Sequence, residues 1–134
     1  MSFSYSACAI DLFDKITDLA DSQSKWSQET FGSDDRRGPI GALRHLEIES
    51  RETCEAWTSH VNGTYSMPQV REEFADCFLL LLDASRRAGI SFHELLDAAI
   101  AKHEKNKRRE WPKAESCGEK PVFHVESEVV VGNE

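Results

Sequence analysis

Apolar side chains recur every three or four residues along four segments of this chain, which is the spacing of one face of an α-helix. Proline, glycine and capping residues mark where each segment begins and ends. Ser91-Phe-His-Glu94, for example, is a capping-box sequence at the start of the fourth segment. The expected helices span about residues 7–28, 39–61, 68–89 and 91–111. With connections this short, the pattern predicts an all-α fold, an antiparallel four-helix bundle.

The character of the sequence changes after the fourth segment. We therefore expect residues 1–114 to form a single α-helical domain and residues 115–134 to form a short C-terminal tail. The tail contains two apolar runs, 121–125 and 129–131. Either run would suit an edge strand or a docking segment, but an irregular, mobile terminus is the interpretation that we favour.

Asp76 stands in a third-helix stretch, Phe74 to Leu82, that is otherwise apolar. A helix that is apolar nearly all round is normally buried, and a buried carboxylate needs a partner. Glu73 precedes Asp76 by three residues and so lies on the same helix face. Two carboxylates on a core helix indicate a cation that prefers oxygen ligands, Mg²⁺ or Mn²⁺. The alternative is one core aspartate paired with an arginine.

The second helix carries a similar acidic pair, Glu49 and Glu52, also three residues apart. A solvated acidic flank is the usual meaning of such a run, and spacing alone does not choose between Glu47 and Glu49. Two E-x-x-[ED] sets on consecutive helices, however, would place four carboxylates around one cavity. Because four like charges cannot gather uncompensated, this arrangement predicts one or two divalent cations.

The fourth helix presents a stripe of hydrogen-bond donors at offsets of zero, three, four and seven residues. Lysine and arginine side chains suit phosphate oxygens, and arginine can bind them bidentately. The alternative is a basic last turn that complements the helix dipole. The stripe consists of Lys102, Lys105, Asn106 and Arg109. An acidic cage and a basic stripe in one small bundle together indicate a polyphosphate bound with Mg²⁺.

The composition excludes some classes of binding partner and indicates a cellular compartment. The formal net charge of -8 over 134 residues argues against nucleic-acid and anionic-membrane binding, since both need a basic surface. No signal peptide is visible, and the four cysteines are too widely spaced for a zinc site, so we expect free thiols in a cytoplasm. No histidine follows a glutamate by three residues, which excludes the ferritin-like di-iron pattern.

Four segments between about residues 20 and 113 resemble the all-α nucleoside triphosphate pyrophosphohydrolases of the MazG-like group, and more narrowly the phage and bacterial dATP/dGTP diphosphohydrolases. Residues 115–134 match no motif of that family. The segments are Trp26-Ser-Gln-Glu-Thr-Phe-Gly32, Gly38-Pro-Ile-Gly-Ala-Leu-Arg-His-Leu-Glu-Ile-Glu49, Glu72-Glu-Phe-Ala-Asp-Cys-Phe-Leu-Leu-Leu-Leu-Asp83 and Asn106-Lys-Arg-Arg-Glu-Trp-Pro112.

The resemblance implies hydrolysis of dATP or dGTP to the monophosphate and pyrophosphate, in the cytoplasm of a bacterium or a phage-infected host, by a homodimer or a dimer of dimers. It makes Glu49, Glu52, Glu73 and Asp76 the ligands of Mg²⁺ or Mn²⁺, with Glu49 or Glu52 as the proton acceptor. Trp26 and Phe31 are candidates to stack on the base, although both also suit a core. The competing hypothesis is a non-catalytic helical protein that binds a partner.

Overall fold

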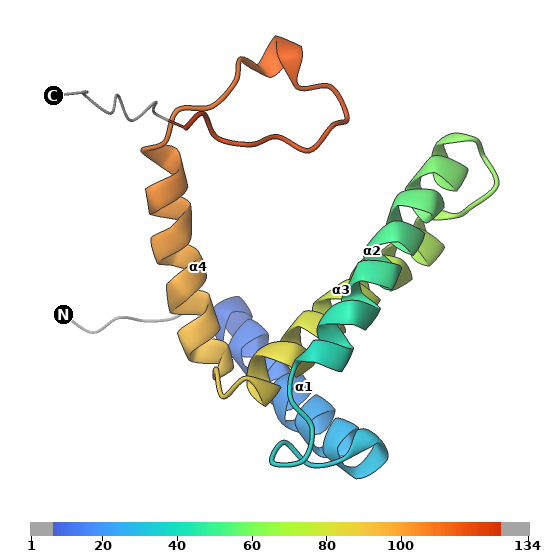
Figure 1. Ribbon diagram of the computed structural model, residues 1–134. Helices are drawn as coiled ribbons and strands as arrows, with labels where there is room; N and C mark the ends of the chain where they lie inside the picture. Colours follow the sequence, from blue (N-terminus) through green and yellow to red (C-terminus); the bar gives the residue numbers. More distant parts are fainter. Residues whose placement is uncertain (1–6, 127–134) are drawn as a thin grey trace, which may run out of the picture. The chain divides into compact units, whose positions relative to one another are not determined.

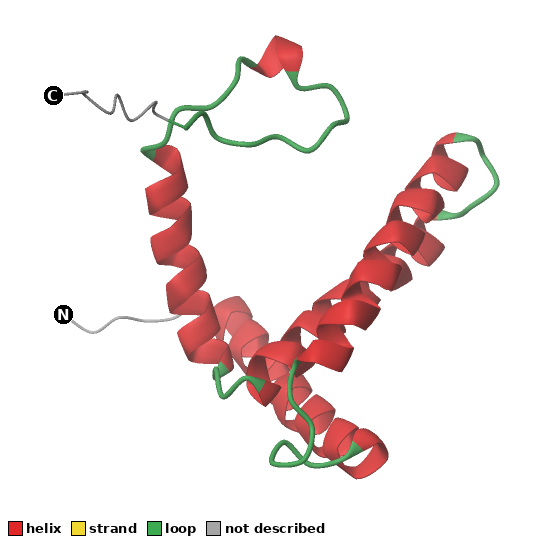
Figure 2. Cartoon of the chain, in the orientation of Figure 1, coloured by secondary structure: helices red, strands yellow, loops and turns green. Residues whose placement is uncertain are grey.

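The computed structural model describes residues 7–126, and all the regular structure in this range is helical. The four α-helices are α1 (Ala7–Phe31), α2 (Ile40–Val61), α3 (Met67–Arg87) and α4 (Phe92–Lys107), followed by one turn of 3₁₀ helix, η1 (Ala114–Ser116) (Figures 1 and 2). The predicted all-α class is therefore confirmed. The apolar run 129–131 lies outside the described residues.

Helix boundaries follow the capping residues closely. The capping box predicted at the start of α4 is present, because the Ser91 N–H donates to Glu94 Oε2 at 2.8 Å and the Glu94 N–H donates to Ser91 Oγ at 3.1 Å. A second capping box, which the sequence analysis did not identify, begins α3 at Ser66 and Gln69. Each box satisfies backbone donors that a helix start would otherwise leave without partners.

Two helices end three or more residues from their predicted ends, and α3 ends at Arg87, two residues before its predicted end. α1 continues to Phe31, three residues beyond the expected end, and α4 stops at Lys107, four residues early. In α4 the indole N–H of Trp111 donates to the carbonyl oxygen of Asn106 at 2.7 Å, and the Arg109 N–H donates to the same oxygen at 3.1 Å. That carbonyl would accept from residue 110 in a continuing helix, so the indole contact favours termination here.

The chain divides into two compact units, one up to Leu95 and one from Leu96 onward. In the first unit, α2 and α3 run antiparallel along their length, joined by a tight turn at residues 62–66, and α1 packs on α3 (Figure 1). The buried apolar side chains in this unit are mostly small: Ala42, Ala56, Val70, Leu82 and Ala84. Small residues let the α2 and α3 backbones approach closely, which brings their acidic faces together.

The expectation that the apolar stretch of α3 is buried within the chain is wrong. Phe74 is 61% exposed and Phe78 is 45% exposed, and Asp76 lies at the surface between them. Periodicity showed that this stretch is apolar, but it could not show which surface covers it. Large aromatic side chains exposed together on one helix are typical of an interface between protein chains.

In the second unit, the irregular segment after α4 folds back on the end of that helix. The Val125 N–H donates to the carbonyl oxygen of Glu110 at 2.9 Å, and the rings of Trp111 and His124 lie edge to face with centroids 6.0 Å apart. The described part of the tail has η1 and otherwise no regular structure up to residue 126. Among the described residues, no helix combines the length and the apolar character that crossing a bilayer requires.

Candidate metal centre and adjoining cavity

Three of the four predicted metal ligands meet on the facing surfaces of α2 and α3. Glu49 and Glu52 come from α2 and Glu73 comes from α3, and one carboxylate oxygen from each lies within 4.8 Å of the others. Spacing of three residues puts Glu49 and Glu52 on one face of α2, and the antiparallel pairing brings Glu73 opposite them. Between Glu47 and Glu49, which the sequence left open, the structure places Glu49 in this cluster.

Asp76 lies one turn along α3 from Glu73 and lines a cavity together with Glu49. Its carboxylate forms no hydrogen bond or ion pair with any residue of the described range 7–126. Within this range, Asp76 therefore has no arginine partner for the structural ion pair that was the alternative interpretation. Its position beside the cluster instead leaves its oxygens open toward the cavity.

Burial and repulsion among these carboxylates both perturb the pKa of Glu73. Partial burial raises the pKa of the Glu73 carboxyl above its usual value, and the negative charges of Glu49, Glu52, Asp76 and Glu72 raise this pKa further. A divalent cation would relieve the repulsion. The donor set fits Mg²⁺ or Mn²⁺, because every available ligand atom is a hard carboxylate oxygen.

Thr53 holds the two halves of the cluster together. It is buried between α2 and α3, and its hydroxyl donates to the carbonyl oxygen of Glu49 at 2.8 Å and lies 3.3 Å from the carbonyl oxygen of Glu73. The same hydroxyl is 3.4 Å from Cys77 Sγ. One side chain thus contacts the backbone at an acidic residue on each helix, which fixes the register of the two E-x-x-[ED] sets.

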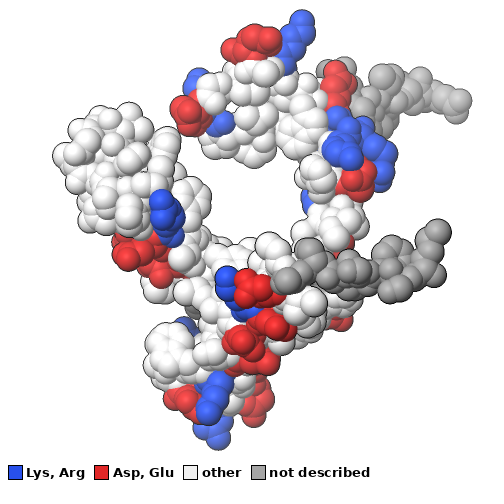
Figure 3. All heavy atoms as spheres, turned by 180° about the vertical axis from the view of Figure 1, so that it is seen from behind, with Lys and Arg blue, Asp and Glu red and all other residues white. Residues whose placement is uncertain are grey.

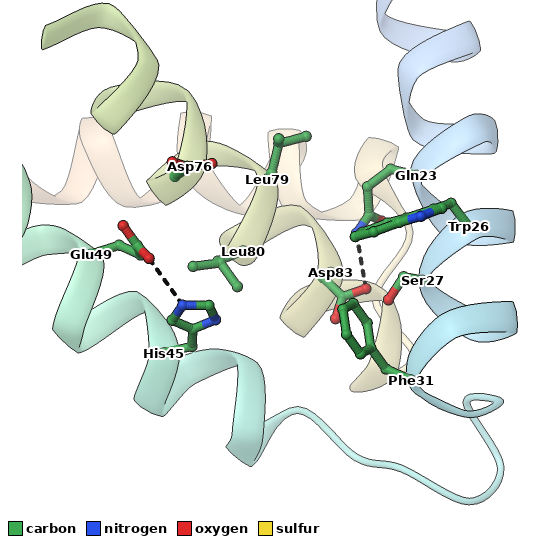
Figure 4. A pocket seen from close by; sticks show the side chains of 10 residues that line it. All are labelled: Gln23, Trp26, Ser27, Phe31, His45, Glu49, Asp76, Leu79, Leu80 and Asp83. Atoms are coloured by element: carbon green, nitrogen blue, oxygen red, sulfur yellow. Dashed lines mark hydrogen bonds and ion pairs between the residues drawn. The ribbon is translucent and has the colours of Figure 1, made fainter. Parts of the chain in front are cut away.

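A cavity of about 240 Å³ connects the carboxylates with the predicted base-stacking residues. Glu49 and Asp76 lie at one end, Trp26 and Phe31 at the other, and the apolar side chains of Leu79 and Leu80 lie between them (Figure 4). Such a combination of apolar walls and a few convergent polar groups is typical of a small-molecule site. Trp26 and Phe31 are therefore cavity residues and not core aromatics.

The two aromatic rings are held in a fixed arrangement. Trp26 and Phe31 pack edge to face, with centroids 5.3 Å apart and planes at 88°. The Arg37 guanidinium lies over the Phe31 ring, 5.7 Å from its centroid, at a favourable cation–π distance. Gly41 makes room for this arginine, because a Cβ at Gly41 would lie 2.8 Å from Arg37 Nη2. A larger residue at position 41 would therefore displace the end of the Arg37 side chain.

A buried ionic network, which the sequence analysis missed, lies at the aromatic end of the cavity. Asp83 bridges two arginines, accepting from Arg86 Nη2 at 2.8 Å and from Arg87 Nε at 2.9 Å. Asp34, from the loop before α2, accepts from Arg86 Nε at 3.1 Å. Arg87 is fully buried and also donates to the carbonyl oxygen of Gly32 at 2.9 Å and to Ser27 Oγ at 2.9 Å.

The network controls the charge of Asp83. Burial by itself raises the pKa of the Asp83 carboxyl, but hydrogen bonds from Ser27, Gln23, Arg86 and Arg87 outweigh burial and hold this pKa far below its usual range. Asp83 is therefore ionised at neutral pH. Its role here is to neutralise the two arginines, and its oxygens are occupied by them and by Gln23.

His45 is a second cavity residue that the sequence analysis did not select. Its Nε2 lies 2.9 Å from Glu49 Oε1, one helical turn along α2 (Figure 4). The spacing of four residues between His45 and Glu49 was a usable signal, since such pairs face each other on a helix. The contact occupies one oxygen of Glu49 and leaves the other oxygen without a contact to the histidine.

The predicted phosphate-binding stripe belongs to the second compact unit. Lys102 and Lys105 are exposed, and Asn106 and Arg109 are half-buried, with Arg109 Nη1 3.5 Å from Asn106 Oδ1. Basic side chains gather near the end of α4 (Figure 3). That the stripe faces the carboxylates in the active protein stays a prediction.

One protein family matches most of the chain. The family model described as dATP/dGTP pyrophosphohydrolase matches residues 19–129, a range that contains all four carboxylates, the cavity and the stripe of α4. No curated protein and no solved structure shows a significant match to the chain.

Proposed function

Because the chain belongs to the dATP/dGTP pyrophosphohydrolase family and is thus a nucleoside triphosphate pyrophosphohydrolase, we propose that it converts dATP and dGTP to the monophosphate and pyrophosphate with the help of Mg²⁺. One observation carries the proposal: a single cavity is lined by Glu49 of the acidic cluster and by Asp76 at one end, and by an aromatic pair at the other. A nucleoside triphosphate has the matching polarity, with an aromatic base at one end and metal-binding phosphates at the other.

Glu49, Glu52, Glu73 and Asp76 would hold the ion in this proposal, and all four are oxygen donors on the facing surfaces of α2 and α3. A bound Mg²⁺ supplies positive charge for the phosphate oxygens and lowers the pKa of water, which provides a nucleophile at neutral pH. The raised pKa of Glu73 supports such a site, because burial and then the neighbouring negative charges both disfavour its ionised form when no cation is bound.

In this proposal, side chains of the protein accept the proton, hold the base and bind the phosphates. Glu49 or Glu52 accepts the proton of the water that attacks the α-phosphorus in line. Trp26 and Phe31 hold the base by stacking at the far end of the cavity. Lys102, Lys105, Asn106 and Arg109 bind the β- and γ-phosphates and stabilise the charge that develops on pyrophosphate.

The first prediction concerns the bond that breaks. Incubation of the protein with dATP and Mg²⁺ in ¹⁸O-labelled water should give dAMP and pyrophosphate, with the label in dAMP, because water attacks the α-phosphorus. Chromatography and mass spectrometry measure both. Chelation of the metal with EDTA should stop the reaction. Primary release of orthophosphate and dADP, or label in pyrophosphate, would contradict the proposed mechanism.

We also propose that the active protein is a homodimer or a dimer of dimers. Phe74 and Phe78 on α3 and Trp57 on α2 are each 45% or more exposed in the first unit. Exposing aromatic side chains of this size to water is costly, since burial of one such side chain is worth about 1.5–3 kcal/mol. A second copy of the chain presents the same apolar faces, and association of the two copies would bury these side chains.

The second prediction tests this association. Light scattering at micromolar concentration should give a mass that is two or four times 15.2 kDa. Phe74→Asp should shift the mass toward 15.2 kDa, whereas Asp18→Asn, at an exposed position of α1, should leave it unchanged. A monomeric mass for the unmodified protein would rule out the proposed assembly.

A further inference from the structure

Among the described residues, only one of the four carboxylates proposed to bind the metal ion is held by another side chain. His45 Nε2 lies 2.9 Å from Oε1 of Glu49, one turn further along α2 (Figure 4). In the same part of the chain, the carboxylates of Glu52, Glu73 and Asp76 have no hydrogen-bond or ion-pair partner. His45 thus orients one ligand candidate, whereas the other three depend on their own backbone positions.

The chemistry of the two groups decides which of them donates. A carboxylate that binds a metal ion is ionised and can only accept, so the proton of this contact lies on Nε2 of His45. The Glu49 carboxylate has two oxygens with about four lone-pair sites in all, and one N–H occupies only one of these sites. His45 can therefore hold Glu49 without competing with a metal ion for it.

The surroundings of Glu49 distinguish this contact from an ordinary pair on a helix surface, which contributes little because water screens both groups. The Glu49 side chain is only 14% exposed, whereas the His45 side chain is 56% exposed. A hydrogen bond is stronger where water has little access. The backbone of Glu49 is held as well, since the hydroxyl of buried Thr53 donates to its carbonyl oxygen at 2.8 Å. Both the carboxylate and the backbone of Glu49 are thus fixed.

His45 acts through Glu49 and is not itself a ligand candidate. The residues whose possible ligand atoms gather within 4.8 Å of one another are Glu49, Glu52 and Glu73. Mg²⁺ also prefers oxygen ligands to imidazole nitrogen. Resting on the proposed function, we infer that His45 is a positioning residue: its Nε2–H holds the Glu49 carboxylate in the orientation that binds Mg²⁺.

His45→Gln and His45→Asn form a matched pair of variants, because both replace the ring with a neutral amide. The amide nitrogen of glutamine lies as many bonds from Cα as the histidine Nε2, so it can donate to Glu49. The amide nitrogen of asparagine lies one bond nearer to the backbone and falls short. Titration of the metal-free protein with Mn²⁺, followed by electron paramagnetic resonance of the free ion, measures the affinity without any nucleotide.

His45→Asn should bind Mn²⁺ about ten- to a hundredfold more weakly than the unmodified protein, the usual effect of removing a residue that orients a metal ligand. His45→Gln should retain most of the affinity. Both variants should melt close to the unmodified protein in EDTA, because His45 is exposed. A purely structural role would instead lower the melting temperature of the metal-free variants and leave the affinity for Mn²⁺ unchanged.

The Mg²⁺ dependence of the reaction gives a second readout. At limiting Mg²⁺, His45→Asn should hydrolyse dATP more slowly than the unmodified protein and than His45→Gln. Excess Mg²⁺ should restore most of the rate, because the variant loses occupancy of the metal site. A loss of rate that excess Mg²⁺ leaves untouched would contradict the positioning role.

The outcomes for His45 and for the proposed function are separate. Equal Mn²⁺ affinity in His45→Asn and the unmodified protein, or an equal loss in both variants, would overturn the role of His45. Release of dAMP by the unmodified protein would then leave the proposed function standing. If the unmodified protein binds Mn²⁺ but releases no monophosphate from dATP or dGTP, the proposed function fails, and the two variants still decide whether His45 orients Glu49 toward the ion.

Discussion

Glu73→Gln should lower turnover by about a hundredfold or more while leaving the metal-free protein at least as stable as the unmodified one. The loss of activity is expected because removal of a single electrostatic stabiliser costs an enzyme about this much. The stability is expected because burial, and then the like charges around it, raise the pKa of Glu73 and so disfavour its ionised form. Glutamine keeps the shape of the side chain and removes the repulsion.

The difference in stability between Glu73→Gln and the unmodified protein should depend on pH. A carboxyl whose pKa is raised by folding contributes stability that is present below its unfolded pKa of about 4.5 and is lost as the pH rises through the folded pKa. The variant has no such loss. In the presence of EDTA, its gain in melting temperature over the unmodified protein should therefore be absent at pH 4 and present at pH 7.

Glu72→Gln is the matched control, because it removes the same charge from the same turn of α3 at an exposed position outside the cluster. It should keep near-normal turnover. Added Mg²⁺ should raise the melting temperature of the unmodified protein and of this control, but much less that of Glu73→Gln. A Glu73→Gln variant with normal turnover would remove Glu73 from the proposed metal site.

Asp83→Asn should destabilise the protein by about 3–5 kcal/mol, the scale observed when one partner of a buried ion pair is removed. Arg87 is completely buried, and without the Asp83 charge its nearest carboxylate oxygen is Asp34 Oδ1, 3.5 Å from Nη1. Denaturant unfolding followed by circular dichroism measures the free energy of unfolding. Asp18→Asn, an exposed aspartate on α1, should change it by no more than about 0.5 kcal/mol.

Acid should remove this difference between the protein and its Asp83→Asn variant. Folding lowers the pKa of Asp83 below its usual value of 3.8, so the carboxylate contributes stability that is fully present above pH 4. That contribution declines as the pH falls from 3.8 toward the folded pKa. A difference in the free energy of unfolding that stays constant down to pH 2 would show that Asp83 acts through packing and not through its charge.

Local signals predicted the helices well, whereas contacts between distant residues could not be read from the sequence. The capping box at Ser91 needs only residues three apart, and it is present as predicted. Arg86 and Asp34, in contrast, are 52 residues apart. No spacing rule relates such positions, so the sequence showed charged residues at both places but not their pairing.

In the candidate site, too, short-range patterns were predictable from the sequence and long-range contacts were not. The acidic cluster was predictable because two short-range patterns on consecutive helices needed only an antiparallel turn to bring them together. Gln23 was not predictable, because a glutamine on a helix is ordinary until its partners are known. Asp76 was selected because its helix was expected to be buried, but it lies at the surface. It remains a ligand candidate because it lines the cavity beside Glu49.

The contacts of Arg87 have a consequence for how the first unit opens. Its guanidinium donates to the backbone carbonyls of Ser27, Gly32 and Arg37, and so ties the end of α1 and the following loop to the end of α3. Moving any one of these segments away from the others would break hydrogen bonds to this buried guanidinium. Backbone amides at the end of α1 and at the end of α3 should therefore exchange with deuterated solvent as one cooperative unit, while the turn at residues 62–66 opens independently.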